Sequence, residues 1–135
     1  MHRSRLAGFI IDCQGTEPEE AARFWSRALG FPAKPPRPGE ELYIRLDTGA
    51  KGQAIEVQKV DHPSRVHLDI EADDIEAEVA RLESLGARRI GQIKSWWVLE
   101  APTGQRFCVI RPQHPPNDGA TESDRESGRA WNRWD

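Results

Sequence analysis

Several features that would assign this chain to a special class of protein are missing. Its 135 residues include only two cysteines, Cys13 and Cys108, and each stands without a close-spaced partner. A disulfide framework needs more cysteines than this, so we interpret both as reduced, buried thiols of a cytoplasmic protein.

Long apolar runs and an excess of positive charge are also missing. No apolar run approaches the length of a membrane-spanning helix, and residues 1–5 lack the apolar stretch of a signal peptide. Lys and Arg number 19 against 22 for Asp and Glu, a net charge of −3. This balance argues against a nucleic-acid or membrane partner. The length predicts one domain with a core of moderate size.

The most informative stretch runs from Val66 to Gly86. Between residues 66 and 71, apolar and polar residues alternate, which is the period of a half-buried strand. The polar members on one side of this strand are His67, Asp69 and Glu71. From Ile75 the apolar spacing becomes helical, and Gly86 ends the helix. A strand therefore offers one histidine and two carboxylates to the same side and leads directly into a helix.

The first half of the chain predicts a strand over residues 9–13 and then a helix. Thr16 and Glu19 have the spacing of a capping box at the helix start. Gly30 has the place of the helix-ending glycine. The apolar stripe of the helix consists of Ala21, Phe24, Trp25, Ala28 and Leu29. We expect this stripe to face the core, so that Phe24→Ala should cost about 3–5 kcal/mol of unfolding free energy.

Alternation predicts further strands over residues 42–47, 53–60, 87–93, 96–100 and 105–111. After Pro112 the composition becomes polar. The tail at residues 113–135 is therefore expected to be flexible, although its Trp131 and Trp134 also suit a segment docked on its own domain or on a neighbour.

The two halves of the chain repeat each other. Each has a strand, an acidic helix start, an apolar stripe ending in Leu-Gly (Leu29-Gly30 and Leu85-Gly86), and three further strands. The order is strand–helix–strand–strand–strand, twice. Such modules cannot close a core alone and must pair. The prediction is an α+β fold with paired βαβββ modules at about 6–60 and 66–112, within one domain at 1–112.

The segments VHLDIEADDIEAEVARLESLGA, LEAPTGQRFCVIRP and FIIDCQGTEPEEAARFWSRALGF carry a resemblance. In this order they resemble the vicinal oxygen chelate superfamily (glyoxalase and bleomycin resistance proteins), and within it the small glyoxalase-like domains, over residues 6–112. The resemblance implies that the sheets of the two modules curl around a cavity and that the protein forms a homodimer.

The resemblance also implies four positions for metal ligands, which here are Ile10, Glu56, His67 and Cys108. Ile10 has no donor atom. Glu56, His67 and Cys108 could make the three protein ligands of a catalytic ion, and the sulfur would favour zinc. Because Ile10 removes one ligand and Cys108 has a good explanation as a packing residue of the last strand, the expectation is a site without metal, with zinc as the alternative.

Asp12 and Asp69 occupy matching places in the two repeats. Together with His67 they are the candidate catalytic groups, since carboxylates that share a cavity can serve as acid and base. The alternative is that the two aspartates brace turns. The candidate ligand-binding residues are Glu56, Gln58, Trp96, Trp97, Arg106 and Cys108. One of the two tryptophans should line the cavity, and Arg106 either holds an anionic group or lies on the surface.

Three functions follow from the resemblance. The leading one is a metal-free enzyme of lyase or isomerase type that acts on a small oxygenated organic molecule. The second is a non-catalytic protein that binds a small molecule such as an antibiotic, because fold alone does not fix function. A metal-dependent glyoxalase or dioxygenase is the least favoured, because Ile10 removes one ligand.

Overall fold

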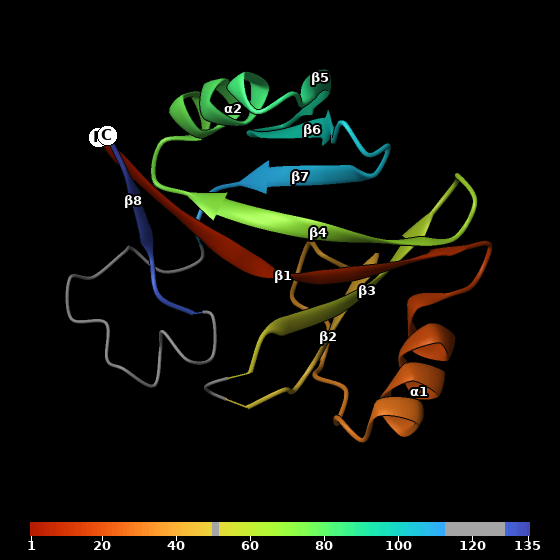
Figure 1. The fold of residues 1–135 in the computed structure, drawn as a ribbon. Coiled ribbons are helices and arrows are strands. Elements are labelled where there is room, and N and C mark those ends of the chain that lie inside the picture. Colours follow the sequence, from red (N-terminus) through yellow and green to blue (C-terminus); the bar gives the residue numbers. More distant parts are fainter. Residues whose placement is uncertain (50–51, 113–128) are drawn as a thin grey trace. The chain divides into compact units, whose positions relative to one another are not determined.

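The computed structural model describes residues 1–49, 52–112 and 129–135, and these form a mixed α+β fold. Eight strands and two helices are described (Figure 1). In chain order they are β1 (His2–Gln14), α1 (Pro18–Leu29), β2 (Tyr43–Leu46), β3 (Ala54–Val60), β4 (Arg65–Ala72), α2 (Ile75–Ser84), β5 (Arg88–Ile93), β6 (Trp96–Glu100), β7 (Arg106–Ile110) and β8 (Asn132–Trp134). No helix in these described ranges is both long and apolar enough to cross a membrane.

The chain divides into two compact units. The α1 unit comprises residues 8–67, and the α2 unit comprises residues 1–7 and 68–135. Strands β1 and β4 each contribute residues to both units. β1 is much longer than the predicted strand at residues 9–13, because its first residues pair with the C-terminal strand β8.

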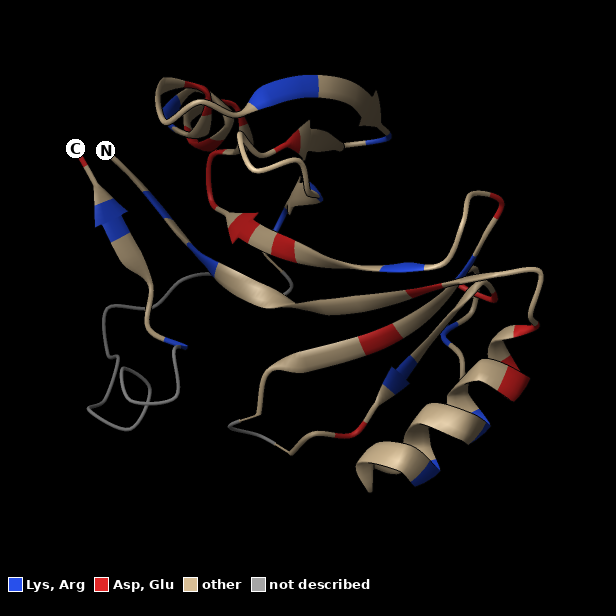
Figure 2. Cartoon of the chain, turned by 45° about the vertical axis from the view of Figure 1, so that its right-hand side comes forward, with Lys and Arg blue, Asp and Glu red and all other residues tan. Residues whose placement is uncertain are grey.

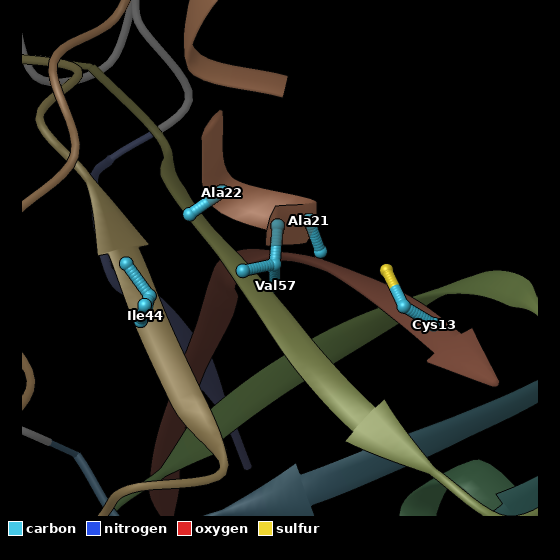
Figure 3. Close-up of a cluster of buried hydrophobic side chains, with 5 residues drawn as sticks. All are labelled: Cys13, Ala21, Ala22, Ile44 and Val57. Atoms are coloured by element: carbon cyan, nitrogen blue, oxygen red, sulfur yellow. The ribbon is translucent and has the colours of Figure 1, made fainter. Parts of the chain in front are cut away.

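In the α1 unit the strand order is β2-β3-β1, with β1 parallel and β2 antiparallel to β3. Helix α1 covers one face of these strands. Figure 3 shows the core, where Ala21 and Ala22 of α1 contact Val57, Ile44 and Cys13 of the strands. Two alanines let the helix axis approach the sheet closely, and Val57 is completely buried.

The start of α1 differs from the capping box that the sequence predicted. The helix begins at Pro18, and Glu17 is the N-cap residue without a side-chain capping bond. The Thr16 hydroxyl donates back to the carbonyl oxygen of Gln14 at 3.4 Å. Because Glu17 is the N-cap residue, Thr16 lies one position before the cap. The predicted end is confirmed, since Gly30 adopts a left-handed φ of 79°.

The expectation that Phe24 belongs to the core was wrong. Phe24 is 62% exposed and Leu29 is 42% exposed, whereas Ala21 and Ala22 are buried. The helix contacts its strands through small residues, and Trp25 supplies the large packing side chain. The apolar stripe is therefore wider than the surface that the helix buries.

In the α2 unit, β4 is parallel to β7, and β6 lies antiparallel between β7 and β5. Helix α2 begins as predicted, because the Asp74 carboxylate caps the backbone N–H of Ala77 at 3.0 Å. Its apolar side enters a core that also includes strand residues. The buried members of this cluster are Ala72, Val79, Leu82, Leu99 and Val109.

The last described residues, 129–135, dock on the α2 unit (Figure 1). β8 pairs antiparallel with the start of β1, with His2 opposite Trp134. The Trp134 indole N–H donates to the Ser4 hydroxyl at 2.8 Å, and the Arg81 guanidinium stacks 3.8 Å from the centre of its ring. Arg5 lies in the same way over Trp131 at 4.3 Å.

A buried charged network lies next to these terminal strands. Glu78 of α2 has no exposed surface, and it accepts hydrogen bonds from Arg81 at 2.7 and 2.9 Å. The His2 ring nitrogen Nε2 lies 2.8 Å from the same carboxylate. Burial raises the pKa of Glu78, but the hydrogen bonds from Arg81, Ser4 and His2 outweigh burial and bring the pKa below its ordinary value.

Candidate functional site

The candidate site of the α1 unit is built on Asp12 of β1, whose side chain is buried. Register partners on adjacent strands share a face of the sheet. Asp12 is the partner of Gln58, and Ile10 is the partner of Glu56, both on β3. Gln58 is in turn the partner of Tyr43 on β2, and its amide donates to the Tyr43 hydroxyl at 3.0 Å. This face is polar, whereas the opposite face of the same strands packs on α1.

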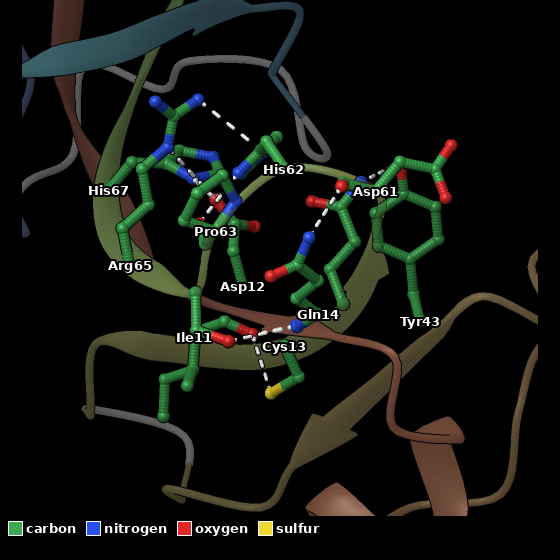
Figure 4. Close-up of polar contacts among 12 residues, drawn as sticks. Ile11, Asp12, Cys13, Gln14, Tyr43, Asp61, His62, Pro63, Arg65 and His67 are labelled. Atoms are coloured by element: carbon green, nitrogen blue, oxygen red, sulfur yellow. Dashed lines mark hydrogen bonds and ion pairs between the residues drawn. The ribbon is translucent and has the colours of Figure 1, made fainter.

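Asp12 pairs with His67 of β4, as Figure 4 shows. The His67 ring nitrogen Nδ1 lies 2.8 Å from Oδ2 of Asp12. A carboxylate can only accept, so Nδ1 carries the proton and donates it. The neutral ring then has its lone pair on Nε2, and Asp12 fixes both the tautomer and the orientation of the imidazole.

Two further cationic or titratable groups reach the same carboxylate oxygen. Nε2 of His62 lies 3.8 Å and Nε of Arg65 lies 3.7 Å from Oδ2 of Asp12. Arg65 also approaches Nε2 of His62 through Nη2 at 3.4 Å. The other oxygen of Asp12, Oδ1, is buried and has no hydrogen-bond partner among the described residues. Asp12 therefore interacts with its surroundings through a single oxygen.

The sequence interpretation missed His62, which stands in the link before β4, and Arg65, which is the first residue of β4. The signal was a histidine and an arginine that flank a Pro-Ser turn at the entry to the central strand. The turn is fixed to the end of β1, where the Gln14 backbone N–H donates to the Ser64 hydroxyl at 2.9 Å. The Gln14 amide donates to the Asp61 carbonyl oxygen at 2.8 Å.

Cys13 belongs to the opposite face of β1 and packs in the core with α1. Burial raises the pKa of its thiol, and the negative charge of neighbouring Asp12 raises it further. The thiol is therefore protonated near neutral pH and acts as a small apolar packing group.

Comparison with known proteins identifies the family of this chain. The model of the glyoxalase-like domain matches residues 8–110. The chain belongs to the glyoxalase-like domain family. This confirms the resemblance found in the sequence. A search of curated protein sequences gave no match.

Three solved structures illustrate the shared fold of this glyoxalase-like protein. A hypothetical protein from Bacillus halodurans is 14% identical with a TM-score of 0.60, over 85% of this chain and 99% of that one. Methylmalonyl-CoA epimerase from Streptomyces coelicolor is 15% identical with a TM-score of 0.52, over 80% and 98%. Homoprotocatechuate 2,3-dioxygenase from Brevibacterium fuscum is 17% identical with a TM-score of 0.54, over 79% and 36%. At these identities the likeness shows the fold alone.

The other candidate residues of the glyoxalase-like chain lie in the α2 unit. Asp69 and Cys108 are register partners on β4 and β7. Trp97 packs against the core cluster, and the Arg89 guanidinium lies over its ring, 4.9 Å from the ring centre. The Lys94 ammonium lies 5.9 Å from the ring centre of Trp96.

Arg106 has a local ion-pair partner. Its Nε lies 3.6 Å from the Glu100 carboxylate, and the two residues are register partners on β7 and β6. The side chain of Arg106 is only partly exposed. The sequence predicted that Arg106 either holds an anionic group or lies on the surface. In the structure its guanidinium is already in an ion pair with Glu100.

The two sides of β4 differ in burial along its length. At its start Val66 is 60% exposed and Leu68 is 44% exposed, whereas the His67 side chain is only 11% exposed and contacts Asp12. At its end, in the α2 unit, Ile70 packs against the core cluster and Ala72 is a buried member of it, and Glu71 on the polar side is buried too. The apolar side of β4 therefore faces a core only in the α2 unit.

The four metal-ligand positions that the resemblance implies do not form a complete set in this chain. Ile10 is a buried aliphatic residue, and it lies in register beside Glu56. Cys108 has Asp69 as its neighbour across the strands of the α2 unit. Because one of the four positions has no donor atom, we derive no step through a metal.

Proposed function

We propose that this glyoxalase-like protein is an enzyme of isomerase or lyase type in which His67, oriented by Asp12, moves a proton of a small oxygenated organic substrate. The supporting observation is the 2.8 Å contact between Nδ1 of His67 and the buried carboxylate of Asp12. A carboxylate that fixes the imidazole tautomer is the arrangement used by histidine general bases.

The proposed chemistry is abstraction of a proton from carbon next to a carbonyl group. Nε2 of His67 accepts this proton, and the resulting imidazolium is stabilised by the Asp12 carboxylate through Nδ1. Return of the proton to a different face or atom gives an isomerised product, and loss of a neighbouring group gives a lyase product. Both outcomes need only one base whose charge changes near neutral pH, which histidine supplies.

Glu56, Gln58 and Tyr43 supply the polar wall for the substrate in this proposal. They occupy the same face of the strands as Asp12, through the register of β3 with β1 and β2. Amide and phenol groups can hold carbonyl and hydroxyl oxygens without taking part in the proton transfer. Asp69, Trp96, Trp97, Arg106 and Cys108 remain predicted site residues, and the cavity implied by the resemblance remains a prediction.

Hydrogen–deuterium exchange at carbon tests the proposal before the substrate is known. The full chain is incubated in D₂O with a panel of 2-oxo acids, 2-oxoaldehydes and hydroxyketones, and loss of the C–H signal is followed by proton NMR. We expect catalysed exchange with at least one class of compound. His67→Ala should abolish it, because the base is lost. Asp12→Asn should reduce it about 10⁴-fold, as expected when a base loses the carboxylate that fixes its tautomer.

His62→Gln is the matched control, since His62 also lies near Asp12 but at 3.8 Å. Its exchange rate should stay within a few-fold of that of the parent protein. Exchange that survives in His67→Ala would contradict the assignment of the base.

A non-catalytic binding protein is the second candidate, favoured by buried Ile10 in place of a polar group beside Glu56. Under this function, native mass spectrometry of purified protein finds a bound small molecule that His67→Ala still retains, and no panel compound exchanges. A bound molecule that exchanges its carbon-bound proton only in the parent protein supports the enzyme instead.

The expectation of a site without metal has its own test. Elemental analysis of protein purified without chelator should find no stoichiometric metal. Stoichiometric zinc in the parent that is lost in His67→Ala would contradict the expectation. The homodimer also remains a proposal for this chain, and its mass in solution tests it.

A further inference from the structure

Arg65 is a cation of the candidate site that the proposed proton transfer leaves without a role. It is the first residue of β4 and stands two positions before His67, so both side chains belong to one side of the strand. Its Nε lies 3.7 Å from Oδ2 of Asp12, the same oxygen that accepts from Nδ1 of His67 at 2.8 Å. Figure 2 shows the blue segment at the start of β4 beside the red segment of β1. The guanidinium and the proposed base are therefore held next to one carboxylate oxygen.

Exposure to solvent increases from Asp12 outwards. The side chain of Asp12 is 1% exposed, that of His67 is 11% exposed and that of Arg65 is 43% exposed. The negative end of the ion pair between Arg65 and Asp12 therefore lies inside the protein, and its positive end is in contact with solvent. An anion that approaches from solvent meets the guanidinium before it meets the carboxylate.

Part of the guanidinium is available to a ligand. An arginine side chain has five N–H donors. Within the described ranges, Arg65 makes polar contacts to the Asp12 carboxylate and to Nε2 of His62 alone. Nδ1 of His62 donates to the Pro63 carbonyl oxygen at 2.9 Å, so Nε2 carries the lone pair and accepts from Arg65. His62 therefore has no N–H group left for an anion in this arrangement, and Arg65 is the donor.

Two further carboxylates belong to this part of the α1 unit. Glu56 is on the same face as Asp12, and its register partner on β2 is Arg45, so a positive charge stands opposite it. Asp61 precedes His62 in the link before β4, and Figure 4 shows its carboxylate pointing away from the Arg65 guanidinium. Neither carboxylate therefore cancels the positive charge that Arg65 presents to solvent.

We infer that Arg65 binds a carboxylate group of the substrate, so that the substrates of this site are 2-oxo acids. Two N–H groups of the guanidinium hold the two carboxylate oxygens, and Nε2 of His67 faces the carbon on the other side of the ketone. The C–H bond at this carbon breaks, its electron pair moves to the ketone oxygen, and the proton passes to Nε2. This inference deepens the proposed function and rests on it, because only an enzyme has a substrate for Arg65 to hold.

Two compounds with the same carbon chain separate the carboxylate from the rest of the substrate. 2-Oxobutanoate and 1-hydroxybutan-2-one both have an ethyl CH₂ group next to the ketone, but only the first has a carboxylate. NMR titration of the full chain measures the dissociation constant of each compound, and proton NMR in D₂O measures exchange at the ethyl CH₂ group. The parent chain should bind 2-oxobutanoate at least about 10-fold more tightly, since a charged hydrogen bond contributes to that complex alone.

Arg65→Met removes the charge and keeps much of the aliphatic stem. It should weaken the binding of 2-oxobutanoate about 10-fold and leave the exchange of 1-hydroxybutan-2-one within a few-fold of the parent rate. Arg65→Lys should recover part of the affinity, because it keeps the charge but loses the paired donors. Arg23→Met is the matched control, since Arg23 is an exposed residue of α1, which packs on the opposite face of the strands. It changes the net charge equally and should affect neither compound.

The pattern of loss distinguishes substrate binding from a structural role of Arg65. If Arg65 only neutralises Asp12, the exchange of both compounds falls together in Arg65→Met, and the inference is overturned. No measurable binding of 2-oxobutanoate to the parent chain, or equal affinity for the two compounds, would overturn it as well. Circular dichroism melts check that each variant is folded.

Failure of the proposed function would look different from failure of this inference. His67→Ala should still bind 2-oxobutanoate but should no longer exchange its ethyl CH₂ protons. Binding that depends on Arg65, in a parent chain that exchanges neither compound, would refute the proton transfer and would make Arg65 the anion-binding residue of a protein without this activity.

Exchange by the parent chain that depends on His67 but is equally fast with and without Arg65, for both compounds, would keep the base and refute the role of Arg65.

Discussion

Replacing Glu78 by glutamine tests the buried network next to the terminal strands. The carboxylate has no exposed surface, and Arg81 donates to both of its oxygens. His2 adds a contact at 2.8 Å. Glu78→Gln keeps the shape of the side chain but removes its charge and one of its two acceptor atoms. One N–H group of the Arg81 guanidinium then faces the NH₂ group of the glutamine amide, so that two donors meet without an acceptor.

The expected loss is about 3 kcal/mol of unfolding free energy at neutral pH. Removing one partner of a buried ion pair costs ~3–5 kcal/mol, because the other charge stays desolvated. We take the lower limit because the glutamine oxygen still accepts one hydrogen bond. The loss is large beside the ~5–15 kcal/mol that stabilises a typical domain. Urea unfolding followed by tryptophan fluorescence measures it.

Acidification should remove the difference between the parent and the variant. The pKa of Glu78 lies below its ordinary value of 4.5. The folded chain therefore holds this proton less tightly than the unfolded chain, and the carboxylate contributes its full stabilisation above pH 4.5. The contribution is lost as the pH falls through the lower folded value. The gap between the parent and Glu78→Gln should narrow over that range.

Glu76→Gln is the control on the same helix. Its carboxylate is 67% exposed and pairs with Arg89 at the surface. A pair of this kind contributes ~0–1 kcal/mol, so its removal should change stability little. The reasoning would be refuted if the losses of unfolding free energy in Glu78→Gln and Glu76→Gln differed by less than about 1 kcal/mol. It would also be refuted if the loss in Glu78→Gln stayed constant from neutral to acidic pH.

Three further outcomes are expected. Trp134→Phe keeps an aromatic ring but removes the indole N–H donor, and it should lower the unfolding free energy by at least about 1 kcal/mol; an unchanged urea midpoint would contradict the hydrogen bond to Ser4. Phe24→Ala should cost less than about 1 kcal/mol because the ring is exposed, whereas Ile44→Ala in the core of the same unit should cost ~2–5 kcal/mol by the same urea assay; equal costs would show that the helix packs differently. Cys13 should react with a thiol reagent at mildly alkaline pH far more slowly in the folded than in the unfolded chain, because its thiol pKa is raised by burial; equal rates, assigned by mass spectrometry, would mean that the thiol is accessible.

Local patterns predicted the elements of the fold well where a residue acts on its near neighbours. The apolar spacing from Ile75 predicted α2, and Gly30 predicted the end of α1. The Thr16 cap was wrong because the helix begins one residue later than predicted, with Glu17 as its N-cap residue and Pro18 as its first helical residue. The capping-box spacing alone does not fix the first helical residue.

Patterns also failed where the answer depends on what lies opposite a residue. The apolar stripe of α1 includes Phe24, but the sheet meets the helix at Ala21 and Ala22. The width of the apolar stripe on a helix does not show how deeply each of its residues is buried. Similarly, the alternation around His67 shows which side chains share a side, but the burial of His67 depends on its contact with Asp12, 55 positions earlier in the chain.

Two of the candidate site residues, Asp12 and His67, contact each other in the structure, but the sequence did not predict that contact. Asp12 and His67 were both chosen as catalytic candidates, because a charged group on the face of an otherwise apolar strand is informative. Their direct pairing was not predicted, since the repeat suggested Asp69 as the mate of Asp12. His62 approaches Asp12 from the link before β4, and Arg65 from the first residue of β4, where polar residues are common and give only a weak signal.

The division of β1 between the two units has a consequence for the order in which the chain can fold on the ribosome. Residues 8–67 form a unit whose internal contacts are all present once that segment has emerged. The seven residues before it belong to the α2 unit, and they acquire β8 and the Glu78 carboxylate as partners only after the second half has been made. During that interval the first strand has an open edge with unpaired N–H and C=O groups. We expect the nascent chain to be most prone to misassociation in this interval, and any factor that covers this edge to raise the yield of folded protein.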